Sequence, residues 1–189
     1  MKIVGISGSP NRDGSNNHMI ERALDIARQR GFEVENISLA GADISPCTDC
    51  HVCRTENTCS IEDDMEGINS SLASADGIIA SSPVYFGTLS GQLKILFDRT
   101  LPLRRNGFLL KDKVGAALAV GASRNGGQEY TVWSIHAWMH IHGMIVVGDN
   151  SHFGGITQKA ADTDEVGMRT VEDTVNKLCD TLERLAPRT

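Results

Sequence analysis

The sequence lacks three features that would point to a membrane or a nucleic acid. No run of 18 apolar residues is present, so we expect no transmembrane helix. Basic residues number 18 against 24 acidic ones, and the net charge of −6 argues against non-specific nucleic-acid binding. The first residues, MKIVGISGSP, lack a signal-peptide pattern, which predicts a cytoplasmic protein with reduced thiols. A length of 189 residues favours one domain, 1–189.

Cysteine is scarce, but four of the five cysteines crowd into thirteen residues, CTDCHVCRTENTC. The spacing is C-x2-C-x2-C-x5-C, and the residues are Cys47, Cys50, Cys53 and Cys59. Three thiols at three-residue intervals can wrap around one point, and thiolates suit iron–sulfur clusters or zinc. A structural zinc site more often uses two separated C-x-x-C arms. A cofactor-free thiol group, or a redox dithiol from Cys50 and Cys53, is a further alternative. We expect Cys179, in a helical pattern, to be a buried and inert thiol.

Short apolar runs alternate with helical periodicity along the chain. We expect strands at 3–6, 32–39, 77–80, 114–120 and 144–147, with the second near a sheet edge. Helices are expected near 19–27, 63–74, 93–101, 130–142 and 171–185, the second capped by Asp63 and Asp64. Near-continuous apolar strands indicate a parallel sheet buried on both faces. The pattern predicts an α/β, flavodoxin-like three-layer sandwich, with a five-stranded parallel sheet of order 2-1-3-4-5.

Two polar stretches lie outside these elements. A cysteine-rich loop covers 44–62, after the second expected strand. The segment 149–163 is the one long polar connection, and we expect that it can reach a partner subunit. His136, His140 and His142 lie on or just after one expected helix. Residue 137 is Ala rather than the Glu of a zincin helix, so we interpret this helix as a surface or subunit-contact helix.

The loop after the first expected strand reads SGSPNRDGSNN and predicts a phosphate site. Ligands of such sheets bind at the carboxyl ends of the strands. Hydroxyls, amides, one guanidinium and the N–H groups of the following helix suit a phosphate dianion. The candidate residues are Ser7, Ser9, Arg12, Ser15, Asn16 and Asn17. The loop matches neither G-x-x-x-x-G-K-[ST] nor G-x-G-x-x-G, so a mononucleotide fits better than ATP or a tightly held NAD.

Two further loops at the same sheet edge predict contacts to a planar ring. In 81–91, Pro83 stiffens the chain and Gly87 permits close backbone approach. Tyr85 and Phe86 are adjacent and point different ways, so one can pack into the core while the other meets a ring. In 121–129, GASRNGGQE, bare backbone can reach the edge of a ring system.

These four segments together resemble the iron–sulfur flavoprotein family, a flavodoxin-like branch of the NAD(P)H-dependent FMN reductases. The resemblance covers roughly residues 1–150 and is specific through the cysteine pattern. It implies FMN, bound by the first loop, and a homodimer or homotetramer. It also implies ring contacts from Pro83, Val84, Tyr85, Phe86, Gly87, Ser123, Asn125, Gly126 and Gly127.

The same resemblance implies a [4Fe–4S] cluster whose ligands are Cys47, Cys50, Cys53 and Cys59. The expected function is transfer of electrons from a donor such as ferredoxin, through the cluster, to FMN and on to an acceptor. One alternative is an NAD(P)H-dependent FMN or quinone reductase without a cluster. Another is a non-enzymatic flavin electron carrier or thiol redox sensor. No proton-transfer dyad stands out, so no side chain is assigned a catalytic acid or base role.

Overall fold

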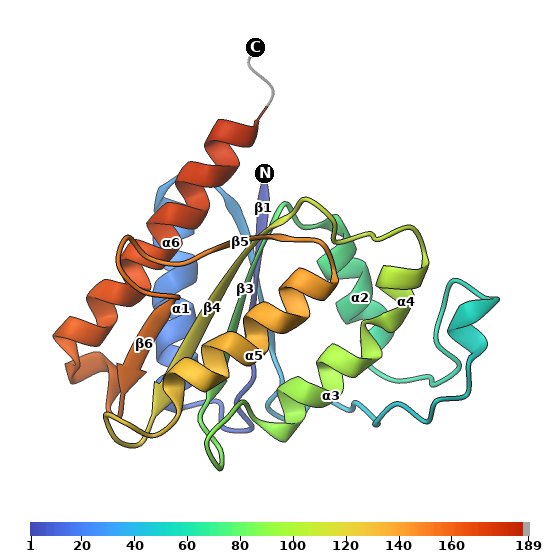
Figure 1. Ribbon diagram of the computed structural model, residues 1–189, viewed down its shortest axis with the longest axis horizontal. Coiled ribbons are helices and arrows are strands. Elements are labelled where there is room, and N and C mark those ends of the chain that lie inside the picture. The colour runs from blue at the N-terminus through green and yellow to red at the C-terminus, as the bar shows by residue number, and fades with distance from the viewer. Residues whose placement is uncertain (187–189) are drawn as a thin grey trace.

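The computed structural model describes residues 1–186 as a parallel sheet between two layers of helices (Figure 1). The sheet has the order β2-β1-β3-β4-β5, with β6 also paired to β4. The strands are β1 (Lys2–Ser7), β2 (Glu33–Ser38), β3 (Gly77–Pro83), β4 (Val114–Gly121), β5 (Ile145–Val147) and β6 (Gly155–Gln158). All pairs are parallel. The predicted flavodoxin-like order is therefore confirmed.

Burial explains why the central strands form where they do. Every residue of β4 is buried, as are all but the last of β3 and all but the first of β1. A strand covered on both faces needs apolar side chains at successive positions, which is why these strands appear as continuous apolar runs. In β2 only Ile37 is buried, as the predicted edge position requires.

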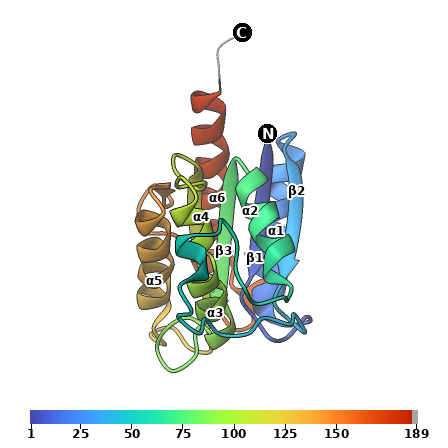
Figure 2. The same ribbon diagram turned by 90° about the vertical axis from the view of Figure 1, so that its right-hand side faces the viewer.

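Helices cover the two faces of the sheet separately, with one layer on each side of the sheet in Figure 1, and Figure 2 looks onto one of these layers. On one face, α1 (Ser15–Gln29) and α6 (Glu165–Leu185) pack on a core that includes Ile3 and Ile79. On the other, α2 (Met65–Ser74), α3 (Gly91–Arg99), α4 (Leu101–Arg105) and α5 (Gln128–Ile141) share a core with Val4 and Ile78. Short 3-10 turns lie at η1 (Val52–Arg54) and η2 (Ala161–Thr163). No helix within residues 1–186 is long and apolar enough to cross a membrane.

The segment 149–163 differs from the expected polar connection because it contains strand β6. The first part of β4, Val114–Ala116, pairs with β5, and its last part, Leu118–Gly121, pairs with β6. The chain therefore leaves the edge of β4 after Val147 and returns to it at Gly155. The sequence of β6, GITQ, is four residues long with two polar positions, so its pattern is too short to indicate a strand.

Candidate functional site

The loop after β1 is fixed to the sheet by two buried side chains. Asn16 and Ser7 are 2% and 1% exposed. The Asn16 side-chain amide donates to Ser7 Oγ at 3.0 Å and to Ser81 Oγ at 3.1 Å. These bonds join α1 to β1 and β3, so both residues hold the loop in place from the buried side. Asn16 Oδ1 is buried with no hydrogen-bond partner among the described residues.

The start of α1 is open to an anion. Gly14 is the residue that precedes the helix, and no side chain caps the first turn. The first N–H groups of a helix lack intrahelical partners and carry the positive end of the helix dipole. Ser15 is the first helical residue, so the predicted loop places its backbone where a phosphate binds best. This donor set fits the phosphate of a mononucleotide.

Other candidate side chains of this loop have protein partners. The Arg12 guanidinium donates to the carbonyl oxygen of Ala40 at 2.9 and 3.2 Å. Ser9 Oγ accepts from the backbone N–H of Asn11 at 3.1 Å, and the Asn17 side chain donates to Glu21. Arg12 is exposed, and its two hydrogen bonds to Ala40 tie this loop to the chain that follows β2.

The loop after β3 turns sharply beyond the end of the sheet. Tyr85 and Thr88 exchange backbone hydrogen bonds of 2.8 and 3.3 Å, and Phe86 and Gly87 between them have φ values of +49° and +86°. A positive φ is uncommon for a bulky residue such as Phe. Tyr85 is 46% exposed and Phe86 fully exposed, so the expectation that one of them packs into the core is wrong. The turn projects past the sheet, which keeps both side chains away from the core.

The loops after β3 and β4 meet at two glycines. A Cβ placed on Gly127 would lie 2.5 Å from the carbonyl oxygen of Gly87, and Gly127 itself has φ +114°. The side chain of Gln128 folds the second loop by accepting from Gly126 N at 2.9 Å and donating to Ser123 O at 2.6 Å. Ser123 and Asn125 stay exposed at this edge. The three predicted cofactor loops therefore follow the ends of the adjacent strands β1, β3 and β4. Two of these loops, those after β3 and β4, meet through glycine backbone without side chains.

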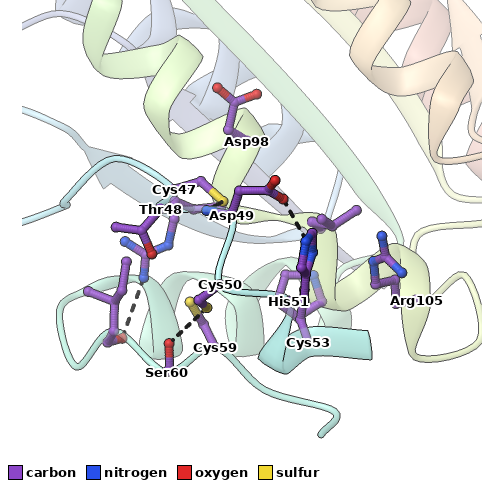
Figure 3. A pocket seen from close by; sticks show the side chains of 14 residues that line it. Cys47, Thr48, Asp49, Cys50, His51, Cys53, Cys59, Ser60, Asp98 and Arg105 are labelled. Atoms are coloured by element: carbon purple, nitrogen blue, oxygen red, sulfur yellow. Dashed lines mark hydrogen bonds and ion pairs between the residues drawn. The ribbon is translucent and has the colours of Figure 1, made fainter. Parts of the chain in front are cut away.

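The four clustered cysteines line one cavity together with Arg99 and Arg105 (Figure 3). The η1 turn carries Cys53, while Asp49 and His51 take left-handed backbone conformations that bend the loop. Cys50 Sγ lies 3.2 Å from Ser60 Oγ, and this contact lowers the pKa of the Cys50 thiol. All four thiols are free of disulfides. Within residues 1–186 no three His, Cys, Asp or Glu side chains converge on a single metal position.

Cys179 is separate from this cavity. It is fully buried in α6, and burial raises the pKa of its thiol to about 11. The predicted burial of this thiol is confirmed.

The two ends of the cysteine loop lie side by side. Asp64 N donates to Asp43 O at 3.0 Å, and Asp43 N donates to the Asp64 carboxylate at 2.8 Å. Ser45 N donates to the Asp63 carboxylate at 3.0 Å. Helix α2 starts at Met65 as predicted, but Asp64 makes no capping bond from its side chain. The carboxylates of Asp63 and Asp64 close the base of the loop, although Asp63 Oδ1 also accepts from Met65 N at 3.1 Å.

A buried ion pair completes this base, and it is the residue pair that the sequence analysis missed. The Arg99 guanidinium contacts the Asp63 carboxylate at 2.6 and 3.0 Å, and the two side chains are 1% and 3% exposed. Burial alone would lower the pKa of Arg99, but Asp63 and nearby Cys59 raise it. Burial would likewise raise the pKa of Asp63, but Arg99 and backbone N–H groups lower it. Both groups are therefore charged.

A long groove joins the cysteine cavity to the loop after β3. Its volume is about 880 Å³, and it runs between α3, α4 and α5. Thr88 and Leu89 line the groove, and Cys47 lines both the groove and the cysteine cavity. Phe97 and Trp138 stack in its wall with ring centroids 4.2 Å apart. The two candidate sites of this chain are therefore connected along one surface.

Of the three histidines on α5 and after it, His140 is exposed as a surface helix requires, whereas His142 is buried. His142 is 2% exposed, and its Nε2 lies 3.0 Å from Thr100 Oγ1, which also accepts from Trp138 Nε1 at 2.9 Å. Burial, with a smaller effect from Arg104, lowers the pKa of His142 to about 4. Burial and His140 lower the pKa of His136 to about 4. His142 is therefore a neutral core histidine.

Comparisons with known proteins agree with this geometry. Residues 1–158 match the model of the NADPH-dependent FMN reductase family. An iron–sulfur flavoprotein of Methanosarcina thermophila is 56% identical over 183 residues, which cover 97% of this chain and 96% of that protein. An iron–sulfur flavoprotein of Methanocaldococcus jannaschii is 46% identical over 190 residues, covering 97% and 98%.

Solved structures show the same fold at lower identity. A flavone reductase superimposes with a TM-score of 0.76 at 22% identity, covering all of this chain and 65% of that chain. A WrbA-like flavodoxin of Agrobacterium tumefaciens superimposes with a TM-score of 0.68 at 18% identity, covering 97% and 96%.

Proposed function

This chain belongs to the NADPH-dependent FMN reductase family and to its iron–sulfur flavoproteins, and we propose that it relays electrons between a [4Fe–4S] cluster and FMN. It is a flavin-dependent oxidoreductase. In this proposal a one-electron donor such as reduced ferredoxin loads the cluster, and an acceptor takes electrons from the flavin. The observation that carries the proposal is that Cys47 lines both the cysteine cavity and the groove that reaches the loop after β3.

The FMN site rests on the three loops at the carboxyl edge of the sheet. The uncapped first turn of α1 offers N–H groups to the phosphate. The turn at Tyr85–Thr88 and the loop at Ser123–Gly127 offer backbone and exposed side chains to the ring. Gly87 and Gly127 hold these two loops in contact, so the ring would meet one continuous surface.

The cluster site rests on the chemistry of the four thiols. A single zinc ion needs its ligands at one point, at bond lengths of about 2.3 Å to sulfur. A four-iron cluster instead takes each thiolate at a different iron, so its ligands surround a larger body. Four cysteines line the cavity at the spacing C-x2-C-x2-C-x5-C, and a run that begins C-x2-C-x2-C is more typical of iron–sulfur proteins than of structural zinc sites. The names of the relatives point to the same cofactor.

Each cofactor supplies the electron chemistry when bound, and the residues of the chain hold and orient it. Arg99 and Arg105 place positive charge at the cysteine cavity, which offsets the charge of four thiolates. Cys47 stands at the junction of the cavity and the groove, so it is the cysteine placed nearest to a route toward the flavin loops. No side chain is given a proton-transfer role.

The oligomer forms part of the same proposal, as a homodimer or homotetramer. Exposed apolar side chains gather on α5 and on the segment before β6. Trp133 and Phe153 are 54% and 51% exposed and pack edge to face at 5.3 Å, and Tyr130 is 71% exposed. Water-exposed aromatic groups of this size favour contact with another protein surface. Light scattering on the purified protein gives the mass that tests this.

Anaerobic purification followed by absorbance, iron and sulfide analysis tests the proposed function. We expect flavin bands on a broad iron–sulfur absorbance, with about four irons and four sulfides for each chain. Substoichiometric reduced ferredoxin and NADPH are then added separately. Faster bleaching by ferredoxin supports the cluster as the entry point.

The outcomes separate the alternatives. Flavin without iron, bleached by NADPH, identifies an FMN or quinone reductase with idle cysteines. Flavin with reversible thiol oxidation and no turnover identifies a redox sensor. Protein that binds neither flavin nor iron after reconstitution contradicts the proposal.

A further inference from the structure

Resting on the proposed cluster site, we infer that Arg99 is a positioning residue for it. In this inference Arg99 clamps the two ends of the cysteine loop to α3 and turns a fixed positive charge toward the cavity. The charge raises the reduction potential of the bound cluster. Nothing in the cysteine spacing indicates this role, because Arg99 lies forty residues beyond Cys59.

The clamp consists of hydrogen bonds from one guanidinium to both ends of the loop. Arg99 Nη1 donates to Ser45 O and to Asp63 Oδ2, both at 2.6 Å. Nη2 donates to Asp63 Oδ1 at 3.0 Å and, more weakly, to Ile61 O at 3.4 Å. Ser45 precedes the first cysteine and Ile61 follows the last, so the bonds span the loop. Every partner is a protein atom, and the clamp therefore exists before any cofactor binds.

The burial of this pair points to a role beyond stability. Arg99 is 1% exposed and ranks among the largest fully buried side chains. A buried ion pair loses much of its attraction to the cost of removing two charges from water, so apolar residues of similar size would stabilise the fold as well. Arg99 Nε is also buried without a hydrogen-bond partner among the described residues. A buried donor left unpaired is costly, and it marks a position that a ligand can satisfy.

The position of the charge sets the direction of its effect. Arg99 lines the cavity formed by the four cysteines, whereas Asp63 does not. The positive end of the ion pair therefore faces the cavity. Arginine stays protonated at all working pH values, so its charge is fixed. Reduction adds one electron to a cluster held by four thiolates, and a buried cation stabilises this extra negative charge with little screening.

Three variants with a matched control test the inference by redox titration of the reconstituted cluster. Arg99→Gln removes the charge, and Arg99→Lys keeps the charge but loses the planar fork. The control is Arg22→Gln, which breaks an ion pair with Glu172 between exposed side chains on α1 and α6. We expect Arg99→Gln to lower the ratio of reduced to oxidised cluster about tenfold at a given potential, which is a shift of about 59 mV downward. Arg99→Lys should lower the reduction potential less than Arg99→Gln does, and Arg22→Gln should leave the potential unchanged.

The third variant guards against unfolding, because Arg99→Gln leaves Asp63 buried and unpaired. The double variant Arg99→Gln with Asp63→Asn removes both charges, and retained flavin reports that it is folded. Its potential should move in the same direction by a smaller amount, since the positive end faces the cavity. An intact cluster with wild-type potential in Arg99→Gln, or in the folded double variant, overturns the electrostatic role.

Hydrogen exchange separates this inference from the proposed function. Wild-type protein that takes up no iron contradicts the proposed cluster and, with it, the electrostatic role. The clamp is then judged on the cofactor-free protein by amide exchange over residues 44–62. Faster exchange there in Arg99→Gln than in wild type and Arg22→Gln supports the clamp. Equal exchange in all three proteins overturns it.

Discussion

Gly127 packs directly against Gly87, so closely that a side chain on Gly127 would lie 2.5 Å from the carbonyl oxygen of Gly87. The contact joins the loops that follow β3 and β4. Gly127 also has φ +114°, which only glycine adopts readily. The spacing of the two loops therefore depends on one position without a side chain.

Gly127→Ala should weaken FMN binding while the fold is kept. The added methyl group forces the two loops apart, and the backbone strain adds about 1–3 kcal/mol. We expect FMN affinity, measured by quenching of flavin fluorescence, to fall about tenfold or more. Gly31→Ala is the matched control, because Gly31 also has a positive φ, +86°, but has open space around it, after α1. Unchanged affinity in Gly127→Ala would show that the ring does not depend on this contact.

Substitution of the clustered cysteines should remove iron but not flavin. Serine at Cys47, Cys50, Cys53 or Cys59 replaces a soft thiolate with a weak ligand. We expect loss of most iron and sulfide, measured chemically after reconstitution, with flavin content near wild type. The control is Cys179→Ala, since Cys179 is buried away from the cavity and should leave the iron content unchanged. Full iron content in the four variants would rule out these ligands.

Asp63→Asn should destabilise the folded protein more than the same change in an exposed ion pair. It leaves the Arg99 charge buried without its partner, which costs about 3–5 kcal/mol. Glu172→Gln, which breaks the exposed pair with Arg22, should cost at most about 1 kcal/mol. Urea unfolding of the cofactor-free proteins measures both. Equal losses of unfolding free energy in the two variants would show that an unpaired Arg99 costs the fold no more than an unpaired surface residue.

The stability of the protein should fall as the pH drops below about 6.5. Burial lowers the pKa of His142 from about 6.5 to about 4. Between these two pH values the unfolded chain binds a proton at this histidine and the folded chain does not, which favours unfolding. The contribution is fully present above pH 6.5 and is lost progressively toward pH 4. At pH 5 the loss for this group is about 2 kcal/mol.

His142→Gln should make the free energy of unfolding less dependent on pH. Glutamine can still donate to Thr100, but it does not titrate. Urea unfolding at pH 7.5 and pH 5 should show a smaller difference in the variant than in wild type. His18→Gln serves as the control, because His18 is exposed on α1. Equal pH dependence of the free energy of unfolding in the His142 and His18 variants would show that His142 is not the group responsible.

Much of the sheet can be predicted from local sequence, because burial on both faces leaves a plain pattern. The strands β1, β3 and β4 appear as apolar runs, and their order follows from alternation with helices. Strand β6 cannot be predicted in this way because it is short and half polar. It forms by pairing with the last part of β4, and the residues of β6 alone do not indicate that pairing.

The candidate site divides in the same way. Cysteine spacing and the serine-rich loop are visible in sequence, because their chemistry is local. The Arg99–Asp63 pair joins residues 36 positions apart, and Asp63 by itself reads as a helix cap. His142 resembles a surface histidine until Thr100 and Trp138 are seen beside it. Contacts of this kind depend on packing between helices, which no single stretch of sequence records.

The closed base of the cysteine loop has a consequence for the loss of the four cysteines. Backbone and carboxylate bonds between 43–45 and 63–64 join the ends of the loop. No thiol takes part in these bonds, so the ends stay joined whatever the cysteines hold. A chain stripped of all four sulfur atoms is therefore expected to keep the start of α2 and the sheet beside it in place.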